Sequence, residues 1–593
     1  MLNKKIQSEI NEPSSNAHIH RTDDHISVMP LGGLEQIGAN CTLIGYKDSW
    51  IMVDLGIAFH DKLGIDVITP DISFPLSLKN KLKGIFITHA HEDHIGAVHY
   101  FWSRFNCPVY LTEFSAEVLK QKLKSRTFDP ETSRIISVFP RSPILVDEFK
   151  VEFISVAHSI LGACGLYIQT LGGSLFHTGD WKVDDNPLLG DKTDFERLSE
   201  IGNNGGVDCL LCDSTNVLVL EDAGSESDVK NSLDKLITKY KNKRITITCF
   251  ASNVARIEAI CELAQKHNRK VVIIGRSIYR MIDAVTETNY YTKNFKRYID
   301  NIVPDEQGAS MSPEQVLMIC TGSQGEAKSA MYRLARGENR FIKLGKQDVV
   351  LFSSKVIPGN ELSIREMQNS LIQMGVNFVT SDFEPDIHVS GHPNKNALRK
   401  MYDSLKPKAL IPLHGDPVML HAHKDFAEEC GIKNTVFAVS GDIITVHKGD
   451  GVLKKLHHRN VVYNALDGKY IIPINSNCLM ERTFMSTQGH ISISFVIDQY
   501  NKLISNTDIL IRGVFLTPNL LSTVRKNILS IITNQLAKAE MGESVINGNL
   551  RRDLQNDVKQ LFSKLCDKKP VINIHVHQIG KTFKNKFSNE EVL

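Results

Sequence analysis

The sequence predicts an α/β protein in which a layered domain is interrupted by a second α/β domain and followed by a small α+β domain. Three patterns predict this fold class. Apolar runs in the first 220 residues end in polar loops, residues 245–353 alternate strand-like and helical stretches, and residues 491–576 combine strand-like runs with two amphipathic helices. A chain of 593 residues is long enough for several domains.

The first polar loop follows the apolar run 85–87 and reads His89-Ala90-His91-Glu92-Asp93-His94. Three imidazoles and a carboxylate beside them are ligands that suit zinc or manganese. Their position after an apolar run predicts a strand-to-helix turn. A polar helix start with incidental histidines is the alternative, and it is disfavoured because further ligands follow downstream.

Three later polar residues stand in the same place, just beyond a strand-like run: His158 after 151–154, Asp180 after 175–176 and His414 after 409–412. Side chains at strand ends gather at one edge of a layered α/β fold. The sequence therefore predicts two adjacent divalent ions, with one bound by His89, His91 and His158, the other by Asp93, His94 and His414, and Asp180 as the bridge. Zinc is the expected metal, with manganese or magnesium as alternatives. Two such ions roughly 3.5–4 Å apart can polarise a phosphoryl oxygen and create a hydroxide.

These motifs resemble the metallo-β-lactamase fold, an αββα sandwich. Asp54, which ends the run 51–54, matches the first motif of that fold. The resemblance implies that Asp54 steadies the histidine turn without touching metal; an ordinary strand-end carboxylate is the alternative. Because this superfamily includes lactamases, glyoxalases, tRNA-processing enzymes and oxidoreductases, the fold does not determine the function.

A second set of motifs narrows the function. Asp213 follows the run 207–211, His392 lies within 388–394, and His414 comes last. An acid and two histidines in this order resemble the motifs of the β-CASP nucleases, which carry an extra domain inserted into the lactamase fold and cut nucleic acids.

Longer motifs resemble ribonuclease J, namely residues 31–38, 250–256, 321–326 and 353–361. The resemblance covers about residues 26–580. It implies 5′-to-3′ exonuclease and endonuclease activity in RNA maturation and decay, a preference for single-stranded RNA with a 5′ monophosphate, and a homodimer or homotetramer supported by the C-terminal domain. This chain departs from the family at Asp213 and Asp416, where Glu is frequent, and in the loop 159–163, where a Pro and an acid are more usual.

The expected chemistry is metal-assisted hydrolysis of RNA phosphodiester bonds. Asp93 would position or deprotonate the nucleophile, His392 would stabilise the scissile phosphate or protonate the leaving oxygen, and Asp213 would orient His392 or His414. The segment that would line the phosphate path is His388, Val389, Ser390, Gly391 and His392. Candidates for a 5′-phosphate pocket, with plain turn roles as the alternative, are Ser252, Asn253, Ser353 and Ser354.

The expected domain boundaries follow from the insertion. Residues 1–25 form a disordered tail, 26–220 and 365–455 the metallo-β-lactamase domain, 221–364 the β-CASP domain, and 456–593 a linker and the C-terminal α+β domain. The alternation within the insert suggests a parallel sheet with crossover helices. Its expected task is to enclose the substrate, because it contributes no metal ligand.

Composition limits the partners. Lys+Arg 69 against Asp+Glu 67 gives a net charge of +2, so RNA would have to meet a local basic patch, for which residues 241–340 are the candidate. Eleven cysteines without a disulfide framework indicate a reducing compartment, the cytoplasm. Cys209 and Cys212 form a C-x-x-C, for which core packing is favoured over zinc. The sequence predicts no membrane span and no signal peptide.

Three rival functions fit parts of the pattern. A β-CASP DNA nuclease usually has Val at the third motif, so His414 favours RNA. A non-catalytic RNA-binding subunit is expected to have lost ligands, and this chain keeps them. A small-substrate hydrolase of the lactamase fold would have little use for a large insert.

Overall fold

The computed structural model describes residues 25–60, 64–124, 134–220, 222, 224–357, 359–539 and 549–579. Two compact units are formed, the first by Met1–Phe59 with Val67–Tyr463 and the second by His60–Asp66 with Asn464–Leu593. Residues 1–24 of the expected disordered tail, and residues 221 and 223 at the expected start of the insert, lie outside the described residues. His25, placed in the tail by the sequence, is the first residue of a strand.

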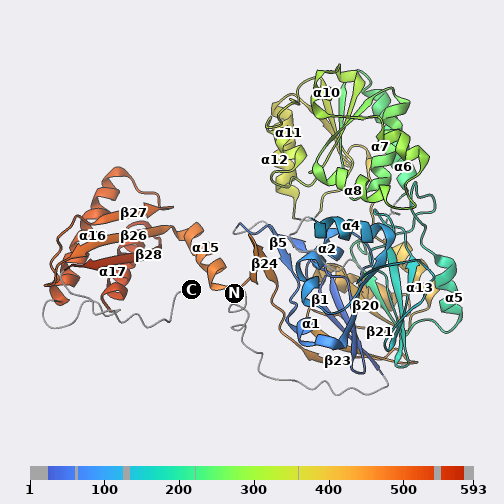
Figure 1. Ribbon diagram of the computed structural model, residues 1–593, viewed down its shortest axis with the longest axis horizontal. Coiled ribbons are helices and arrows are strands. Elements are labelled where there is room, and N and C mark those ends of the chain that lie inside the picture. Colours follow the sequence, from blue (N-terminus) through green and yellow to red (C-terminus); the bar gives the residue numbers. More distant parts are fainter. Residues whose placement is uncertain are drawn as a thin grey trace. The chain divides into compact units, whose positions relative to one another are not determined.

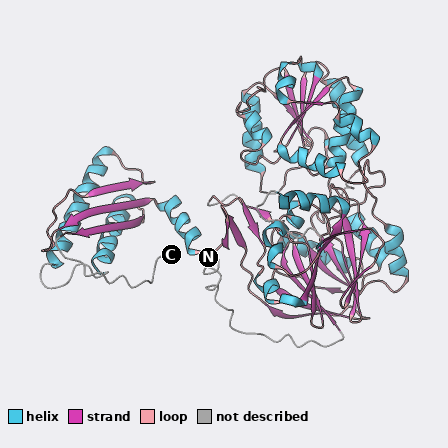
Figure 2. Ribbon diagram, viewed as in Figure 1, coloured by secondary structure: helices cyan, strands magenta, loops and turns pink. Residues whose placement is uncertain are grey.

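Two sheets pack face to face in the first unit (Figures 1 and 2). The eight-stranded sheet runs in the order β23 (Leu453–His458), β22 (Asp442–His447), β1 (His25–Gly32), β2 (Cys41–Tyr46), β3 (Ser49–Val53), β6 (Leu82–Phe86), β7 (Val109–Thr112) and β8 (Ile135–Val138). The seven-stranded sheet runs β21 (Asn434–Thr435), β20 (Ala409–Leu413), β13 (Cys209–Asp213), β12 (Gly173–His177), β11 (Cys164–Thr170), β10 (Phe149–Ser155) and β9 (Ile144–Val146).

Side chains from both sheets, such as Ile51 and Phe153, form one buried core between them. Helices pack outside the sheets: α4 (Glu113–Lys124) contacts β7 and β8, α14 (Pro417–Glu429) contacts β20, and α5 (Phe195–Asn203) packs on α13 (Lys395–Leu405). Strands covered on both faces are apolar at nearly every position, which is why they appear in the sequence as runs and not as alternations. The expected αββα sandwich is confirmed.

The inserted domain has a six-stranded sheet in which every pairing is parallel, as expected. Its order is β16 (Ile302–Val303), β15 (Lys270–Ile274), β17 (Val316–Cys320), β14 (Arg244–Thr248), β18 (Asp348–Phe352) and β19 (Asn377–Val379). Figure 1 shows α6 (Glu226–Lys239) and α7 (Val254–Lys266) on one side and α11 (Ala330–Ala335) and α12 (Glu361–Gln373) on the other. The smaller helices are α8 (Arg276–Thr286), α9 (Lys293–Ile299) and α10 (Asp305–Ser310).

The predicted return to the first domain at residue 365 is too early. Met367 and Leu371 of α12 pack in the core of the insert, and β19 pairs with β18. The insert therefore continues through Val379. A three-residue strand has too short an apolar run to be seen in the sequence.

The boundary predicted at residue 455 falls inside β23, which pairs with β22, and the first unit continues to Tyr463. Strand β23 carries exposed Lys and His side chains at the edge of its sheet, so its sequence does not read as a strand.

The second unit contains the three-stranded sheet β27 (Asp508–Arg512), β26 (His490–Ile497) and β28 (Val571–Gln578). Its buried core joins the sheet to α16 (Pro518–Ala539) and α17 (Asn549–Cys566) through residues such as Ile493, Val524 and Val558. This confirms the expected C-terminal α+β domain. The sequence did not reveal the hairpin β24 (Asn464–Asp467) and β25 (Tyr470–Pro473), or α15 (Asn477–Gln488).

None of the helices within the described ranges is both long enough and apolar enough to span a membrane.

A buried ion pair gives a test of the insert. Arg244 Nε lies 2.6 Å from Asp348 Oδ1, and both side chains are buried. Arg244→Met should lower the free energy of unfolding by about 3–5 kcal/mol, because it leaves a buried carboxylate unpaired. Denaturant unfolding of the full chain measures this. The control is Lys266→Met, which breaks the largely exposed pair with Asp234 and should cost at most about 1 kcal/mol. Equal effects of the two changes would contradict the prediction.

Candidate metal centre

The histidine turn connects β6 to the short helix α2 (Glu92–Ile95) and is held by Asp54. Asp54 Oδ1 accepts a hydrogen bond from the Thr88 backbone N–H at 2.8 Å, and Oδ2 lies 2.9 Å from Thr88 Oγ1 and 2.8 Å from His94 Nδ1. Asp54 is buried and has a positive φ of 60°. It therefore steadies the turn from behind.

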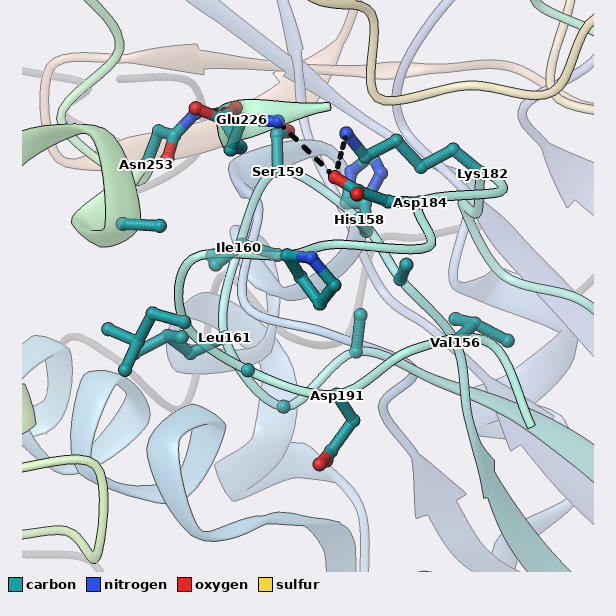
Figure 3. A pocket seen from close by; sticks show the side chains of 17 residues that line it. Val156, His158, Ser159, Ile160, Leu161, Lys182, Asp184, Asp191, Glu226 and Asn253 are labelled. Carbon is teal, nitrogen blue, oxygen red and sulfur yellow. Dashed lines mark hydrogen bonds and ion pairs between the residues drawn. The ribbon is translucent and has the colours of Figure 1, made fainter. Parts of the chain in front are cut away.

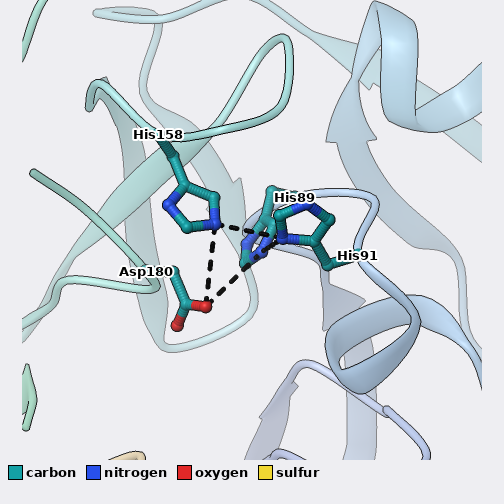
Figure 4. Close-up of side chains that lie close together, drawn as sticks. All are labelled: His89, His91, His158 and Asp180. Atoms are coloured by element: carbon teal, nitrogen blue, oxygen red, sulfur yellow. Dashed lines mark hydrogen bonds and ion pairs between the residues drawn. The ribbon is translucent and has the colours of Figure 1, made fainter. Parts of the chain in front are cut away.

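The first candidate ligand group combines His89, His91, His158 and Asp180 (Figure 4). His91 Nδ1 lies 3.1 Å from His89 Nε2 and 3.0 Å from His158 Nε2. Asp180 Oδ2 is 3.8 Å from the Nε2 atoms of both His89 and His158. Three ring nitrogens and one carboxylate oxygen thus converge on one point.

The second candidate group combines Asp93, His94, His414 and again Asp180. Asp180 Oδ1 lies 3.2 Å from His94 Nε2 and 3.1 Å from His414 Nδ1. Asp93 Oδ2 is 3.2 Å from His414 Nε2. In both groups the ligand atoms lie within 4.8 Å of one another, and the structure brings together all seven residues proposed from the sequence.

The two groups differ in charge. Burial lowers the pKa of His89 and His158 well below its usual value and that of His91 to about 4, so these imidazoles are neutral. For His94 and His414 burial acts in the same direction, but Asp180 and the neighbouring carboxylates outweigh it. They raise the pKa of His94 far above its usual value and that of His414 to about 10.

These residues fit a pair of divalent cations. Three neutral imidazoles that point their ring nitrogens at one another need a shared proton or cation between them. In the part of the chain that the structure describes, the buried Oδ1 of Asp180 has no aligned hydrogen-bond donor. A cation in the second group would replace the protons that His94 and His414 carry beside the carboxylates.

His392 and Asp213 lie next to this centre. His392 Nδ1 is 2.8 Å from Asp213 Oδ2, and Asp213 Oδ1 accepts hydrogen bonds from the backbone N–H and hydroxyl of Thr215. Burial opposes protonation of His392, but Asp213 outweighs it and raises the pKa. Asp213 also lies 3.5 Å from His414 Nδ1, so it contacts both histidines that the sequence linked to it.

The rest of the segment 388–392 is held in place by Asn216. Its side-chain amide donates to Ser390 Oγ at 2.6 Å and to the His392 carbonyl at 3.2 Å. Val389 is buried, and the Gly391 carbonyl lies 2.6 Å from His158 Nδ1. The contact between Gly391 and His158 thus places His392, the next residue, beside the centre.

The four candidates for a 5′-phosphate pocket have different surroundings. Asn253 caps α7 and donates to Glu226 Oε1 at 3.0 Å, and Ser353 Oγ accepts from Arg256 and donates to the Ile387 carbonyl. Ser252 Oγ lies 3.0 Å from His91 Nε2. Ser354 is buried beside Ser353. Asn253 and Ser353 therefore have internal partners, whereas Ser252 faces the centre.

The sequence did not identify the polar wall beside His158. Lys182 Nζ and Asp184 Oδ2 form a fully buried ion pair at 2.9 Å in the pocket that His158, Glu226 and Asn253 also line (Figure 3). Glu226 ends the acidic stretch 221–226 that opens the insert, where nothing marks it as part of a site. The sequence feature that could have marked this position is Ser225, which forms a capping box with Asp228 and so predicts the start of helix α6.

Two other sequence features have structural roles. Cys209 and Cys212 are buried in β13, and burial raises the pKa of both thiols. Of the basic residues in 241–340, Arg244 is paired with Asp348 and Arg256 with Glu226, both inside the insert. These two arginines cannot belong to a basic surface patch.

Four family models match the chain: the metallo-beta-lactamase superfamily at residues 35–238, the ribonuclease J beta-CASP domain at 242–371, the Zn-dependent metallo-hydrolase RNA specificity domain at 385–438, and the ribonuclease J C-terminal domain at 477–579. Together with the fold, they define a metal-dependent hydrolase of the metallo-β-lactamase superfamily with a β-CASP insertion.

Relatives narrow the class further. Ribonuclease J of Sinorhizobium meliloti is 33% identical over 571 residues, covering 95% of this chain and 99% of that one. Those of Helicobacter pylori (34%; 84% and 71% covered) and Synechocystis (32%; 92% and 86% covered) are similar. The chain belongs to the ribonuclease J family. A crystal structure of a protein of unknown function from Enterococcus faecalis, with a TM-score of 0.50 and 18% identity over 71% of this chain and 100% of that one, shows the fold alone.

Loss of a ligand should lower the metal content of the centre. His91→Ala removes a neutral nitrogen ligand, and Asp180→Ala removes the carboxylate common to both groups, so bound metal should fall in each, with the larger loss in Asp180→Ala. Elemental analysis of purified protein measures metal per chain. His421→Ala, an exposed histidine on α14, serves as the control and should keep its metal. Full metal content in both ligand variants would rule out the centre.

Proposed function

We propose that this chain is a two-metal ribonuclease that hydrolyses RNA phosphodiester bonds. Two adjacent ligand groups that share Asp180 carry the proposal, in a chain of the ribonuclease J family. A third grouping of Asp180, Asp213, His392 and His414 places His392 beside them. Zinc is the proposed metal, because the donors are imidazoles and carboxylates at the ends of strands. The alternatives of a DNA nuclease or a non-catalytic RNA-binding subunit have no observation that favours them.

In this proposal His89, His91 and His158 would hold one ion, Asp93, His94 and His414 would hold the other, and Asp180 would serve both. Bound ions would supply an activated water and neutralise charge on the phosphoryl oxygens. Asp93, whose carboxylate is partly exposed, is placed to orient the nucleophile or accept its proton.

His392 is assigned to the substrate. Because Nδ1 is engaged by Asp213, Nε2 is the nitrogen that a phosphate would meet, as a hydrogen-bond donor or as the acid for the leaving oxygen. Asp213 holds the His392 ring in that orientation and favours the protonated form of His392. His388 to His392 would line the phosphate path, with Ser390 and the Gly391 amide as donors.

The proposed substrate is single-stranded RNA with a 5′ monophosphate, cut by 5′-to-3′ exonuclease and endonuclease activity. Ser252 and Ser354 are the better candidates for contacts with the terminal phosphate, since Asn253 and Ser353 already have internal partners. The cytoplasm is the proposed compartment, because all eleven cysteines are free thiols.

His392→Ala tests the proposed chemistry. It should keep its metal but lose RNA cleavage by about 10²-fold or more, the scale of a missing acid or oxyanion donor. Rates on RNA labelled with a 5′ monophosphate or triphosphate, with metal content measured on the same sample, decide it. His421→Ala should cleave as the wild type does. If metal and activity fall together, His392 is a ligand and its assignment is wrong.

The second unit is proposed to support dimerisation. A chain ending at Tyr463 keeps all seven ligands, His392 and the insert, so it should bind metal normally while its dimer weakens. The cleavage rate of long RNA should fall more than that of a short oligonucleotide, because extended substrates can contact surface beyond the centre. Light scattering on both lengths measures the assembly. A truncated chain that stays dimeric, or a monomeric full-length protein, would exclude this role.

A further inference from the structure

Each candidate metal-binding imidazole has a ring nitrogen that is held by a neighbouring group. In His414 this nitrogen, Nδ1, also lies 3.1 Å from Asp180 Oδ1. For four of the five histidines, the partner lies in the sandwich domain: Thr88 for His89, Asp54 for His94, Gly391 for His158 and Thr215 for His414. Such partners select the tautomer and orient the ring toward the metal.

His91 differs from these four histidines. Its Nδ1 faces His89 and His158, so Nδ1 is the nitrogen available to a metal. Its Nε2 lies 3.0 Å from the hydroxyl oxygen of Ser252, which is 161 positions along the chain, between β14 and α7 of the insert. The inserted domain, which supplies no ligand itself, therefore touches a ligand directly.

The loop that carries Ser252 is held firmly. Next to it, the Asn253 side chain accepts from the Arg256 backbone N–H and donates to Glu226, and the Arg256 guanidinium binds the same Glu226 carboxylate at 2.7 and 2.8 Å. Asn253, Arg256 and Glu226 are all buried. Asp184 of the sandwich domain accepts from Ser225 Oγ at 2.8 Å, which ties the start of α6 to the same region.

We propose that Ser252 is a positioning residue of the metal centre. Its Oγ accepts a hydrogen bond from the Nε2–H of His91 and fixes the tautomer that leaves Nδ1 free as a ligand. The Ser252 hydroxyl keeps its own proton, which it can donate to a substrate phosphate. Retention of the ion at His89, His91 and His158 thus depends on where the insert sits. This role rests on the two-metal centre of the proposed function.

The dependence is specific to one ion. The second ion would be held by His94 and His414, whose Nδ1 atoms contact Asp54 and Thr215 of the sandwich domain. Loss of the Ser252 hydroxyl should loosen the first ion alone, by the 10–100-fold that is typical when such a partner is removed.

The test measures zinc per chain during titration of the full-length protein with a chelator. Ser252→Ala should release one of two equivalents at a chelator concentration about 10–100-fold lower than the wild type does, and the second equivalent at the wild-type concentration. Ser252→Thr, which keeps a hydroxyl, should restore retention. The matched control is Ser227→Ala, which removes the bond from Ser227 Oγ to the Asn186 carbonyl, a link between insert and sandwich that touches no ligand.

The outcomes separate this inference from the proposed function. If Ser252→Ala releases both ions at the wild-type chelator concentrations while His91→Ala loses one ion, the role of Ser252 is overturned and the centre stands. Two ions retained by His91→Ala would overturn the centre and this role together. Equal loosening in Ser252→Ala and Ser227→Ala would show a general effect of domain contacts and overturn the specific role. Thermal unfolding of each zinc-loaded variant confirms that the fold is kept.

Discussion

The buried carboxylate of Asp180 is the group on which the centre depends. Its two oxygens face two different sets of imidazoles, so one side chain defines both candidate ion positions. A buried carboxylate is costly without compensating charge, and the surrounding histidines or a cation must supply it. The loop before it can approach the histidine turn only because residue 179 is glycine: its φ is +56°, and a Cβ there would lie 2.9 Å from Thr88 Cβ.

Around this carboxylate, the sandwich and the insert have separate tasks. The sandwich supplies every candidate ligand from the ends of its strands. The buried core between its two sheets fixes the distances between those strand ends. The insert supplies Glu226 and Asn253 to the pocket beside His158, and Ser252 to the contact with His91. Buried ion pairs such as Arg256–Glu226 keep this part of the insert rigid, which explains why part of the insert's basic character never reaches the surface.

The pattern of apolar residues in the sequence predicted the elements that contain long apolar runs, and it did not predict the elements that lack them. Strands β10, β12, β13 and β20 were anticipated, because each contains a run of buried apolar residues. The sequence did not reveal three other elements. Strand β19 is very short, strand β23 is a polar edge strand, and helix α15 buries only Leu479. The boundaries at 365 and 455 were misplaced for this reason.

The sequence by itself determined which residues could bind metal, because each candidate stands next to a strand end and strand ends of a layered fold meet at one edge. Only the tertiary structure decided what holds those residues. Asn253 and Ser353 look equivalent to Ser252 and Ser354 in the sequence, yet two have internal partners and Ser252 faces His91. The contact between Ser252 and His91 joins residues 161 positions apart, and it depends on how the cores of the sandwich and the insert pack, which local patterns do not encode.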